Sequence, residues 1–354
     1  MSEIHLFLIW SEAKESRNKI INDLDGEFNI LHIETVAWSS ELFSENLSRL
    51  YGQKLPNNSF KQKHCGTGPF TCIIVEDINP TYESIDIGSG RGYLLLNKNI
   101  YNLKVKYREW TGGGHKIHAT NNIEESEHDI RLIFHKKPID FKEKKEFGDY
   151  DLDIKYRDLL GSHGYKNSDD FLLCLNSVPN YVIMRGEIDK YFLNGNEDID
   201  ILVENKKDFI YTLNLKHQGK KFSTSRYQVK IGDVYVHIDI NYIGDGCFDS
   251  RWQKKMLNEK IINKDICILN ESNKQKADIY HSIIHKNIIR QSESLTLFNK
   301  IIKEFDITVP QDPMIEYYGY QYNGPKESLY RQLFPIYREF RYVLHKIKTK
   351  IISL

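Results

Sequence analysis

The chain has 354 residues, 49 basic and 49 acidic side chains, and 40% hydrophobic residues. This length predicts about two domains, each long enough to bury a core of its own. The neutral charge argues against a general nucleic-acid-binding protein, which usually has a basic surplus, although it permits a local basic site for a small anion. The five cysteines form no C-x-x-C pair, which argues against a disulfide framework or a zinc site and favours a reducing cytoplasm. No signal peptide and no run near the ~20 apolar residues of a membrane span is visible, so we expect a cytoplasmic protein.

The first 137 residues alternate between apolar strand patterns and helical spacing. We expect strands over 4–10, 28–36, 70–76 and 116–119, and helices over 11–24, 43–51 and 123–134. Ser39 or Ser40 is the expected cap of the second helix. A polar loop that runs to Lys63 and a longer loop that ends in the glycines of 111–114 complete the pattern. This order predicts an α+β sandwich of the ferredoxin-like kind, with helices packed on one antiparallel sheet.

A charged stretch with one proline, residues 138–155, is the predicted linker between a first domain of 1–137 and a second domain of 156–354. In the second domain we expect helices over 169–175 and 207–215, and strands over 181–184, 199–203, 227–229 and 234–240. Beyond residue 249 the pattern is mainly helical. We therefore expect a second α+β domain with a helical extension.

Two strands of the second domain carry acidic side chains. Asp198 and Asp200 lie two residues apart in EDIDILV, so the period of a strand puts both side chains on one face. Asp239 lies on the polar face of VYVHIDIN, and the three carboxylates converge if the two strands pair. Three close carboxylates repel one another unless a cation joins them, and Mg²⁺ prefers such oxygen ligands. Two interpretations stay open: a metal-dependent site, or acidic residues that solvate an exposed strand face.

The segment RGEIDKYFLNGNEDIDILV, followed by VHIDIN, resembles the core of the polymerase β-like nucleotidyltransferase superfamily. The resemblance implies a mixed sheet and a magnesium site, with Mn²⁺ as the alternative ion, formed by Asp198, Asp200 and Asp239. It also implies transfer of a nucleotidyl group from a nucleoside triphosphate to a small phosphorylated or sugar-type acceptor. Gly186 matches the glycine of the family's phosphate-binding turn, but Glu187 stands where the family has serine.

Basic residues near this motif are the candidates for phosphate contacts in place of that serine. They are Arg185, Lys220, Lys221 and Arg226. The segment NYIGDGCFDSRWQKKML resembles nucleotidyltransferase-like domains associated with bacterial surface polysaccharides, which implies a role in polysaccharide biosynthesis. His281 and His285, four residues apart, form either a metal pair or a packed pair.

A second site is predicted in the first domain, in the segment GGGHKIHATNNIEE. A glycine-rich loop leads there to a short strand with His118, and Thr120, Asn121 and Asn122 offer polar caps for the helix that follows. The N-terminus of a helix binds anions, and a histidine beside it can accept a phosphoryl group as a nucleophile. Three roles stay open for His118: phosphotransfer, non-covalent ligand binding and a structural role.

This segment resembles nucleoside diphosphate kinase, whose I-H-G-S-D motif carries a histidine that becomes phosphorylated. The resemblance covers about residues 4–134 and implies a kinase-like, ferredoxin-like domain that can form oligomers. It implies a phosphohistidine at His118, with Asp129 in place of the family's supporting glutamate. The family's lysine after the first strand is absent, because the sequence there reads Trp10-Ser11-Glu12.

The same resemblance points to substrate-binding candidates in the first domain. They are Tyr51, Arg108, His115 and Thr120, with Arg91 as a further phosphate contact. His64, with Lys61 and Lys63, either lines the same pocket or is a loop histidine without function.

Two functional hypotheses follow from these motifs. The first is a magnesium-dependent nucleotidyltransferase or phosphotransferase that acts on a small acceptor, with a phosphohistidine step at His118. The second is a non-catalytic protein that retains both folds and senses nucleotide. The missing lysine and serine favour the second, whereas three clustered carboxylates disfavour it. A nucleic-acid-modifying nucleotidyltransferase is disfavoured by the neutral charge.

Overall fold

The computed structural model describes residues 2–86, 92–142, 151–185, 198–218, 226–245 and 247–281, with short pieces at 300–301, 303–304, 307–308 and 321–322. The chain is a mixed α/β protein with mixed sheets. It divides into two compact units, of which the first comprises Met1–Pro179, Lys207–Lys216 and Val229–Tyr235 and the second comprises the rest. The stretch 138–155, predicted as a linker, belongs to the first unit. Within the described ranges, no helix has the length and apolar character needed to cross a membrane.

The first unit contains one large sheet and the helices around it. Its elements are β1 (Glu3–Ile9), η1 (Ser11–Ser16), α1 (Arg17–Glu27), β2 (Asn29–Ala37), α2 (Phe43–Leu50), α3 (Phe60–Cys65), β3 (Phe70–Asp77), β4 (Tyr82–Asp86), β5 (Tyr93–Asn97), α4 (Lys98–Trp110), β6 (Ile117–Ala119), α5 (Ile123–Phe134), η2 (Pro138–Phe141), β7 (Asp151–Tyr156), α6 (Ser168–Leu175) and most of α7 (Lys206–Thr212). The sheet has the order β6-β1-β3-β2-β7. Only β7, at one edge, runs parallel to its neighbour, and the other pairs are antiparallel.

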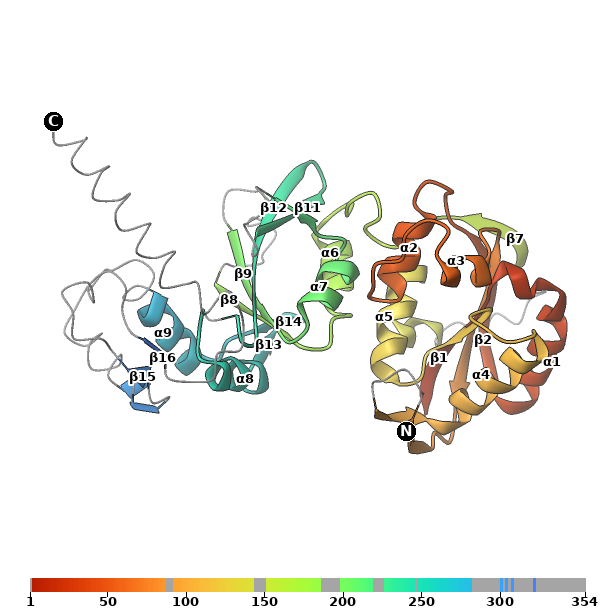
Figure 1. Ribbon diagram of the computed structural model, residues 1–354, viewed down its shortest axis with the longest axis horizontal. Coiled ribbons are helices and arrows are strands. Elements are labelled where there is room, and N and C mark those ends of the chain that lie inside the picture. The colour runs from red at the N-terminus through yellow and green to blue at the C-terminus, as the bar shows by residue number, and fades with distance from the viewer. Residues whose placement is uncertain are drawn as a thin grey trace. The chain divides into compact units, whose positions relative to one another are not determined.

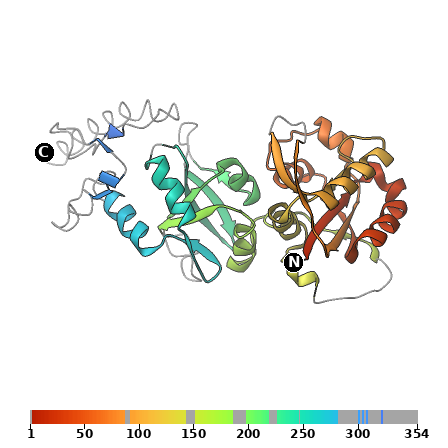
Figure 2. The same cartoon turned by 90° about the horizontal axis from the view of Figure 1, so that it is seen from below.

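Helices cover both faces of this sheet. α1 and α4 lie on one side and α5 lies on the other (Figure 1), and Figure 2 shows the same layers from below. The strand side chains that face α1 and α4 form a buried core, with Phe7 of β1, Ile73 of β3, and Ile117 and Ala119 of β6 among them. Side chains alternate across a strand, so His118, between Ile117 and Ala119, points to the face that α5 covers.

Two segments predicted as loops contain regular structure. The loop expected before Lys63 contains α3, and the longer loop expected before the glycines contains β4, β5 and α4. Asn97 caps α4 by accepting hydrogen bonds from the backbone N–H groups of Asn99 and Ile100. The buried face of α4 includes a lysine, Lys104, which weakens the apolar periodicity by which a helix is recognised from sequence.

The predicted cap of α2 is wrong. α2 begins at Phe43 and has no side-chain cap, because Ser39 is engaged elsewhere. The hydroxyl and the backbone N–H of Ser39 both donate to the carboxylate of Asp158, at 2.9 and 3.0 Å. Asp158 also accepts a hydrogen bond from Asn46 of α2 at 2.7 Å. The carboxylate therefore ties the segment before α2 to the helix itself.

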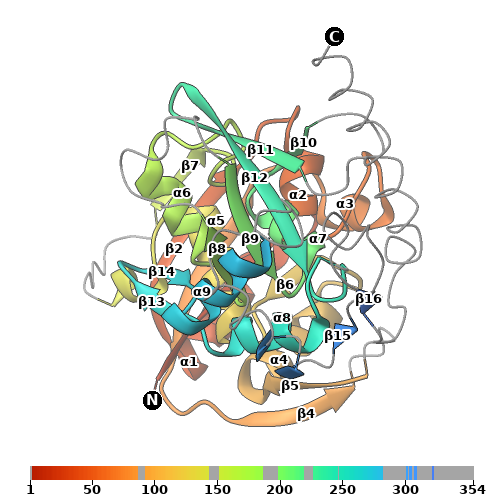
Figure 3. The ribbon, with the colours of Figure 1, turned by 90° about the vertical axis from the view of Figure 1, so that its left-hand side faces the viewer.

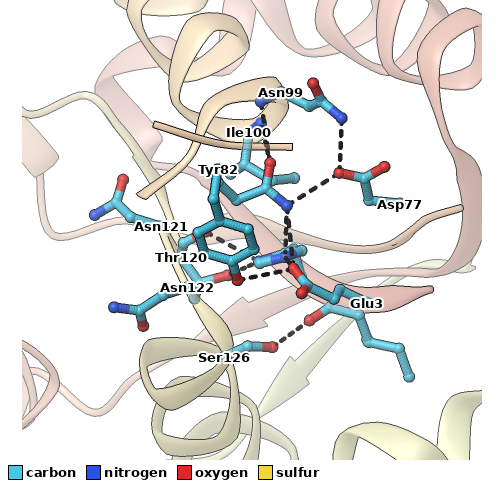
Figure 4. A network of polar contacts seen from close by, with 12 residues as sticks. Glu3, Asp77, Tyr82, Asn99, Ile100, Thr120, Asn121, Asn122 and Ser126 are labelled. Carbon is cyan, nitrogen blue, oxygen red and sulfur yellow. Dashed lines mark hydrogen bonds and ion pairs between the residues drawn. The ribbon is translucent and has the colours of Figure 1, made fainter. Parts of the chain in front are cut away.

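A buried polar network joins the start of β1 to the ends of β3 and β6 (Figure 4). The ring of His5 is fully buried, with Nδ1 3.1 Å from the carbonyl oxygen of Thr120 and Nε2 3.1 Å from the Glu3 carboxylate. Asn97 donates to Asp77 at 3.0 Å and to Glu3 at 3.2 Å. Burial lowers the pKa of His5. The network fixes the chain just after β6, and it thereby helps to fix the strand that carries His118.

The guanidinium of Arg49, on α2, is the main polar link between distant segments of the first unit. Its side chain is 1% exposed, and it donates to the carbonyl oxygens of Leu160, Tyr211 and Thr212 and to the hydroxyl of Ser162. Within the described residues, no carboxylate pairs with it. Two of the accepting carbonyls belong to Tyr211 and Thr212, the last residues of α7, where the helix dipole favours a positive charge. Arg49 therefore holds the end of α7 against α2.

The second unit contains a seven-stranded sheet and two described helices. Its elements are β8 (Tyr181–Arg185), β9 (Asp198–Val203), β10 (Lys216–His217), β11 (Arg226–Ile231), β12 (Val234–Tyr242), α8 (Ser250–Asn258), β13 (Ile261–Asn263), β14 (Ile266–Ile268), α9 (Glu271–Tyr280), β15 (Ile307–Thr308) and β16 (Gln321–Tyr322), with parts of β10, β11 and β12 assigned to the first unit. The sheet has the order β10-β11-β12-β9-β8-β14-β13. β9 runs parallel to β12 and antiparallel to β8, and Figure 3 shows these three strands side by side. β13 and β14 interrupt a region expected to be mainly helical.

Replacing Arg49 by methionine should lower the free energy of unfolding by about 3 kcal/mol, because it leaves several buried carbonyl groups without donors. Urea unfolding followed by circular dichroism measures this change. The control is Glu45→Gln on the same helix, which removes an ion pair to Lys216 whose side chains are 58% (Lys) and 36% (Glu) exposed. The control should cost less than about 1 kcal/mol. Equal losses in the two variants would contradict the role given to Arg49.

Candidate functional site

Strands β9 and β12 bring the predicted carboxylates together on the second unit's sheet. The register places Asp200 beside Asp239, and Asp198 beside His237. Ile199 between the two acidic residues of β9 is fully buried, so the aspartates lie on the opposite, more open face. Asp198 is exposed, and Asp200 and Asp239 are half-buried. The three acidic side chains therefore share one face of two adjacent strands.

Two arginines accompany these carboxylates. Arg185 Nη2 lies 3.0 Å from Asp200 Oδ2, and Arg226 Nε lies 3.8 Å from Asp239 Oδ1. Burial raises the pKa of Asp239, and the negative charge of Asp198 raises it further, against the opposing charges of both arginines. The two cations therefore compensate the negative face only in part. Arg185 and Arg226, both predicted as phosphate contacts, lie at the carboxylate site.

The chemistry of this face suits a hard divalent cation, because all three side chains present carboxylate oxygens. Among the described residues, no group of three or more His, Cys, Asp or Glu side chains lies close enough together to hold a metal ion. An ion bound by Asp198, Asp200 and Asp239 would have to displace the arginines from the carboxylates.

Other residues predicted for this site or as phosphate or metal contacts lie outside the described residues, namely Gly186, Arg91, Lys220, Lys221 and His285.

The most complete site of the first unit is centred on His118. Its Nε2 lies 2.6 Å from Asp129 Oδ2 on α5, and the side chains are 7% and 2% exposed. Burial opposes ionisation of Asp129, but hydrogen bonds from His118 and His128 outweigh it and lower the pKa of the carboxyl group. An ionised carboxylate only accepts hydrogen bonds, so Nε2 carries a proton and Nδ1 of the neutral ring carries the lone pair. Among the described residues, Nδ1 has no hydrogen-bond partner.

Tyr51 contacts the His118 ring, and two basic side chains, Lys61 and Arg108, lie near Tyr51 or near the strand of His118. The Tyr51 contact is edge-on, with ring centroids 5.3 Å apart, and Lys61 Nζ lies 3.7 Å from the centroid of the Tyr51 ring. Arg108 donates from Nε to the carbonyl oxygen of Ile117 at 3.0 Å. No acidic side chain in the described ranges forms an ion pair with Arg108. Burial raises the pKa of Tyr51 well above its usual range, so its hydroxyl stays protonated and can donate. Lys61 and Arg108 therefore bring positive charge close to Tyr51 and to the backbone of β6.

His115 and His64 lie close to each other, and the charges of Lys61 and Arg108 act on His115. The backbone N–H of His115 donates to His64 Nδ1 at 3.3 Å, and the two ring centroids are 5.7 Å apart. Burial lowers the pKa of His115 to about 4, and the charges of Lys61 and Arg108 lower it further. Gly114 has a φ of 76°, and a Cβ there would lie 2.3 Å from His64 Nδ1. Glycine is therefore required at position 114, where these two histidines meet. His64 lies beside His115, which was predicted as a substrate-binding residue.

Sequence reasoning missed Lys104, a buried lysine under the site. Its Nζ donates to the carbonyl oxygen of Ala119 and to Asn121 Oδ1, both at 2.9 Å. Burial lowers the pKa of Lys104 to about 8. The position was visible in the sequence, because it shares the buried face of α4 with Ile100 and Tyr107 at helical spacing. A lysine among apolar residues at helical spacing indicates a buried charged group.

The N-terminus of α5 does not offer the anion site that its polar caps predict. Asn122 Oδ1 accepts from the backbone N–H of Glu125 at 2.8 Å, and the Glu125 carboxylate accepts from the Asn121 N–H at 2.6 Å. The helix therefore caps its own N-terminus and adds negative charge there. Thr120 is fully buried, and its hydroxyl accepts from the backbone of β1 at 3.0 Å. The predicted substrate contact of Thr120 is corrected accordingly: its side chain belongs to the polar network of Figure 4.

The low pKa of Lys104 gives a pH dependence with a definite sign. Between about pH 8 and about pH 10.5 the folded chain has released this proton while the unfolded chain still holds it, so stability rises with pH. The wild type should therefore gain up to about 3 kcal/mol relative to Lys104→Met across this window. Urea unfolding at several pH values measures the gain. The control, Lys98→Met, changes a lysine that is 49% exposed and should give a curve parallel to that of the wild type. Parallel curves for Lys104→Met would contradict the assignment.

Comparison with known proteins adds no assignment. No protein-family model matches the chain, and no curated protein sequence matches it. The function proposed for the chain therefore rests on its residues and their geometry.

Proposed function

We propose that the first unit transfers a phosphoryl group through His118, in the manner of a nucleoside diphosphate kinase-like domain with phosphate contacts of its own. The observation that carries the proposal is the 2.6 Å hydrogen bond from His118 Nε2 to Asp129, which leaves Nδ1 as the nucleophilic atom. The antiparallel order β6-β1-β3-β2 supports a ferredoxin-like class for this unit. The edge-on contact of Tyr51 with His118 supports the same likeness.

In this reaction Nδ1 attacks the terminal phosphorus of a nucleoside triphosphate. A nitrogen–phosphorus bond forms, the bond to the bridging oxygen breaks, and the nucleoside diphosphate leaves with that oxygen. An acceptor oxygen then takes the phosphoryl group and His118 returns to its neutral form. The imidazole ring is positively charged while it holds the phosphoryl group, and Asp129 stabilises that charge. Arg108 and Lys61 supply positive charge for the phosphate oxygens.

A second candidate function belongs to the carboxylate face of the second unit, which we propose as a metal-dependent nucleotidyltransferase site. The adjacency of Asp200 and Asp239 on parallel strands and the raised pKa of Asp239 favour it. Bound Mg²⁺, or Mn²⁺, would neutralise the carboxylates and stabilise charge on a transferred phosphate. Arg185 and Arg226 would then be free to bind phosphate oxygens. A small phosphorylated or sugar-type acceptor, as used in surface polysaccharide synthesis, is the proposed substrate class.

The phosphohistidine is tested with a γ-labelled nucleoside triphosphate. The wild type should retain an acid-labile label, and His118→Asn should lose it by at least about 100-fold because the nucleophile is gone. His163→Asn, which changes a histidine 74% exposed, is the matched control and should label like the wild type. Label retained on His118→Asn would sink the proposal. Binding of nucleotide without any label on the wild type would leave the non-catalytic, nucleotide-sensing alternative.

The carboxylate site is tested by stability as well as by activity. At 100 times its dissociation constant, Mg²⁺ should stabilise the wild type by about 2.7 kcal/mol. The double variant Asp200→Asn/Asp239→Asn should lose this gain, together with transfer of an α-labelled nucleotidyl group. Asp233→Asn, an exposed position in the turn before β12, should keep both. Equal stabilisation of the double variant would mean that the aspartates only solvate the strand face.

A further inference from the structure

A chain of hydrogen bonds leads from Asp129 away from the reacting nitrogen of His118. Asp129 binds His118 through Oδ2 and His128 through Oδ1, with His128 Nδ1 at 2.8 Å. The other nitrogen of His128, Nε2, lies 3.1 Å from the hydroxyl oxygen of Thr212. Asp129 and Thr212 are buried and His128 is half-buried, so solvent does not replace these contacts freely.

We propose that His128 and Thr212 are positioning residues for phosphoryl transfer at His118. This inference rests on the proposed phosphotransfer function and assigns it two residues that do not touch the substrate. Neither residue belongs to the motif around His118, and Thr212 lies 84 positions after His128 in the chain.

The direction of each hydrogen bond follows from the groups involved. The carboxylate of Asp129 accepts only, so His118 Nε2 and His128 Nδ1 both carry protons. In the neutral form of the His128 ring the lone pair is then on Nε2, and that atom accepts from the Thr212 hydroxyl. The hydrogen bonds therefore run from the Thr212 hydroxyl to His128 and from His128 to Asp129, and His118 donates to the other oxygen of Asp129. Each oxygen of the carboxylate has one imidazole donor.

The geometry gives His128 a specific task. A carboxylate held by one donor can turn about its Cβ–Cγ bond, whereas donors on both oxygens fix its plane. A fixed Asp129 holds His118 in the tautomer that leaves Nδ1 free and keeps the ring in one orientation. Attack at phosphorus requires this alignment, because a small misplacement of reacting atoms slows such a step strongly.

Thr212 is itself held in place by buried groups. Its carbonyl oxygen accepts from Arg49 Nη2 at 2.9 Å and from the thiol of Cys174 at 3.3 Å. These bonds fix the backbone of Thr212, so the hydroxyl is placed for His128 without a contribution from the exposed surface. The end of α7 is therefore a built part of the arrangement behind Asp129.

Four variants separate positioning from a merely structural role. Thr212→Val removes the hydroxyl at nearly constant shape, and Thr212→Ser keeps it. His128→Leu removes both ring nitrogens, and His128→Asn keeps one donor near the place of Nδ1. The single-turnover rate of γ-phosphate transfer to His118 and the KM for the nucleotide are measured for each variant. The state of the His118 ring is followed by ¹H–¹⁵N spectra, assigned with His118→Asn.

We expect His128→Leu to lower the transfer rate by about 10- to 100-fold and Thr212→Val by about 3- to 10-fold, with the KM unchanged. Thr212→Ser should restore the wild-type rate, and His128→Asn should recover part of the loss. The His118 ring should be the Nε2–H tautomer in the wild type and should lose that preference in His128→Leu.

Wild-type rates in His128→Leu and Thr212→Val would overturn the inference and leave the proposed phosphotransfer standing. A rate loss that Thr212→Ser fails to restore would also overturn it, because the hydroxyl would then not matter. If the wild type itself takes no label, the proposed function fails and the ring spectra still decide this point. Unchanged His118 signals in His128→Leu would then show that His128 does not position the ring.

Discussion

The guanidinium of Arg49 is the interaction on which the arrangement of the first unit depends. Removing an arginine side chain from water costs several kcal/mol, and a carboxylate partner is the usual compensation. Here the compensation comes from three carbonyl oxygens and one hydroxyl. The hydroxyl is that of Ser162, which itself donates to Asn46 at 2.6 Å. A neutral hydrogen-bonded shell therefore replaces the counter-ion, and it works only if every acceptor stays in place.

The position of Arg49 explains why this shell matters for the His118 site. Arg49 lies near the end of α2, and Tyr51, two residues later, places its ring against His118. The same guanidinium holds the carbonyl of Thr212, whose hydroxyl contacts His128 behind Asp129. One buried charge thus fixes groups on two sides of the histidine. Both supports of the His118 site depend on Arg49, so a change at Arg49 should disturb them together.

The parts of the fold that sequence could predict are those with a simple period. Strands β1, β3 and β6 and helix α5 were expected almost within their observed bounds, because their apolar residues repeat locally. α4 was missed because Lys104 stands on its buried face, where an apolar residue is expected. The hairpin of β4 and β5 was missed because it is mostly exposed, with Leu96 and Asn97 at the end of β5 as its buried residues.

The candidate sites also combine contacts that are local in sequence with contacts that only the folded structure shows. The common face of Asp198 and Asp200 follows from strand alternation, which is a local property, whereas the place of Asp239 beside Asp200 depends on the pairing of β9 with β12. The contact of His128 with the second oxygen of Asp129 is local, since the two residues are neighbours in sequence. The contact of His128 with Thr212 is not, because no local pattern connects residues 84 positions apart. Tertiary contacts of this kind are fixed only when the whole core is packed.

A net charge of zero over the whole chain is compatible with a local group of basic side chains, because electrostatic interactions in solution act only over short distances. Charges more than about 8–10 Å apart are largely screened in solution, so the balance over the whole chain says little about one pocket. Lys61, Arg108 and buried Lys104 act on one another within the first unit, as the lowered pKa of Lys104 and of His115 shows. Two acidic side chains, Glu125 and Asp129, act on Lys104, and Asp129 is already engaged by two imidazoles. Arg108 forms no ion pair with an acidic side chain of the described residues, and a bound anionic ligand would supply its counter-ion.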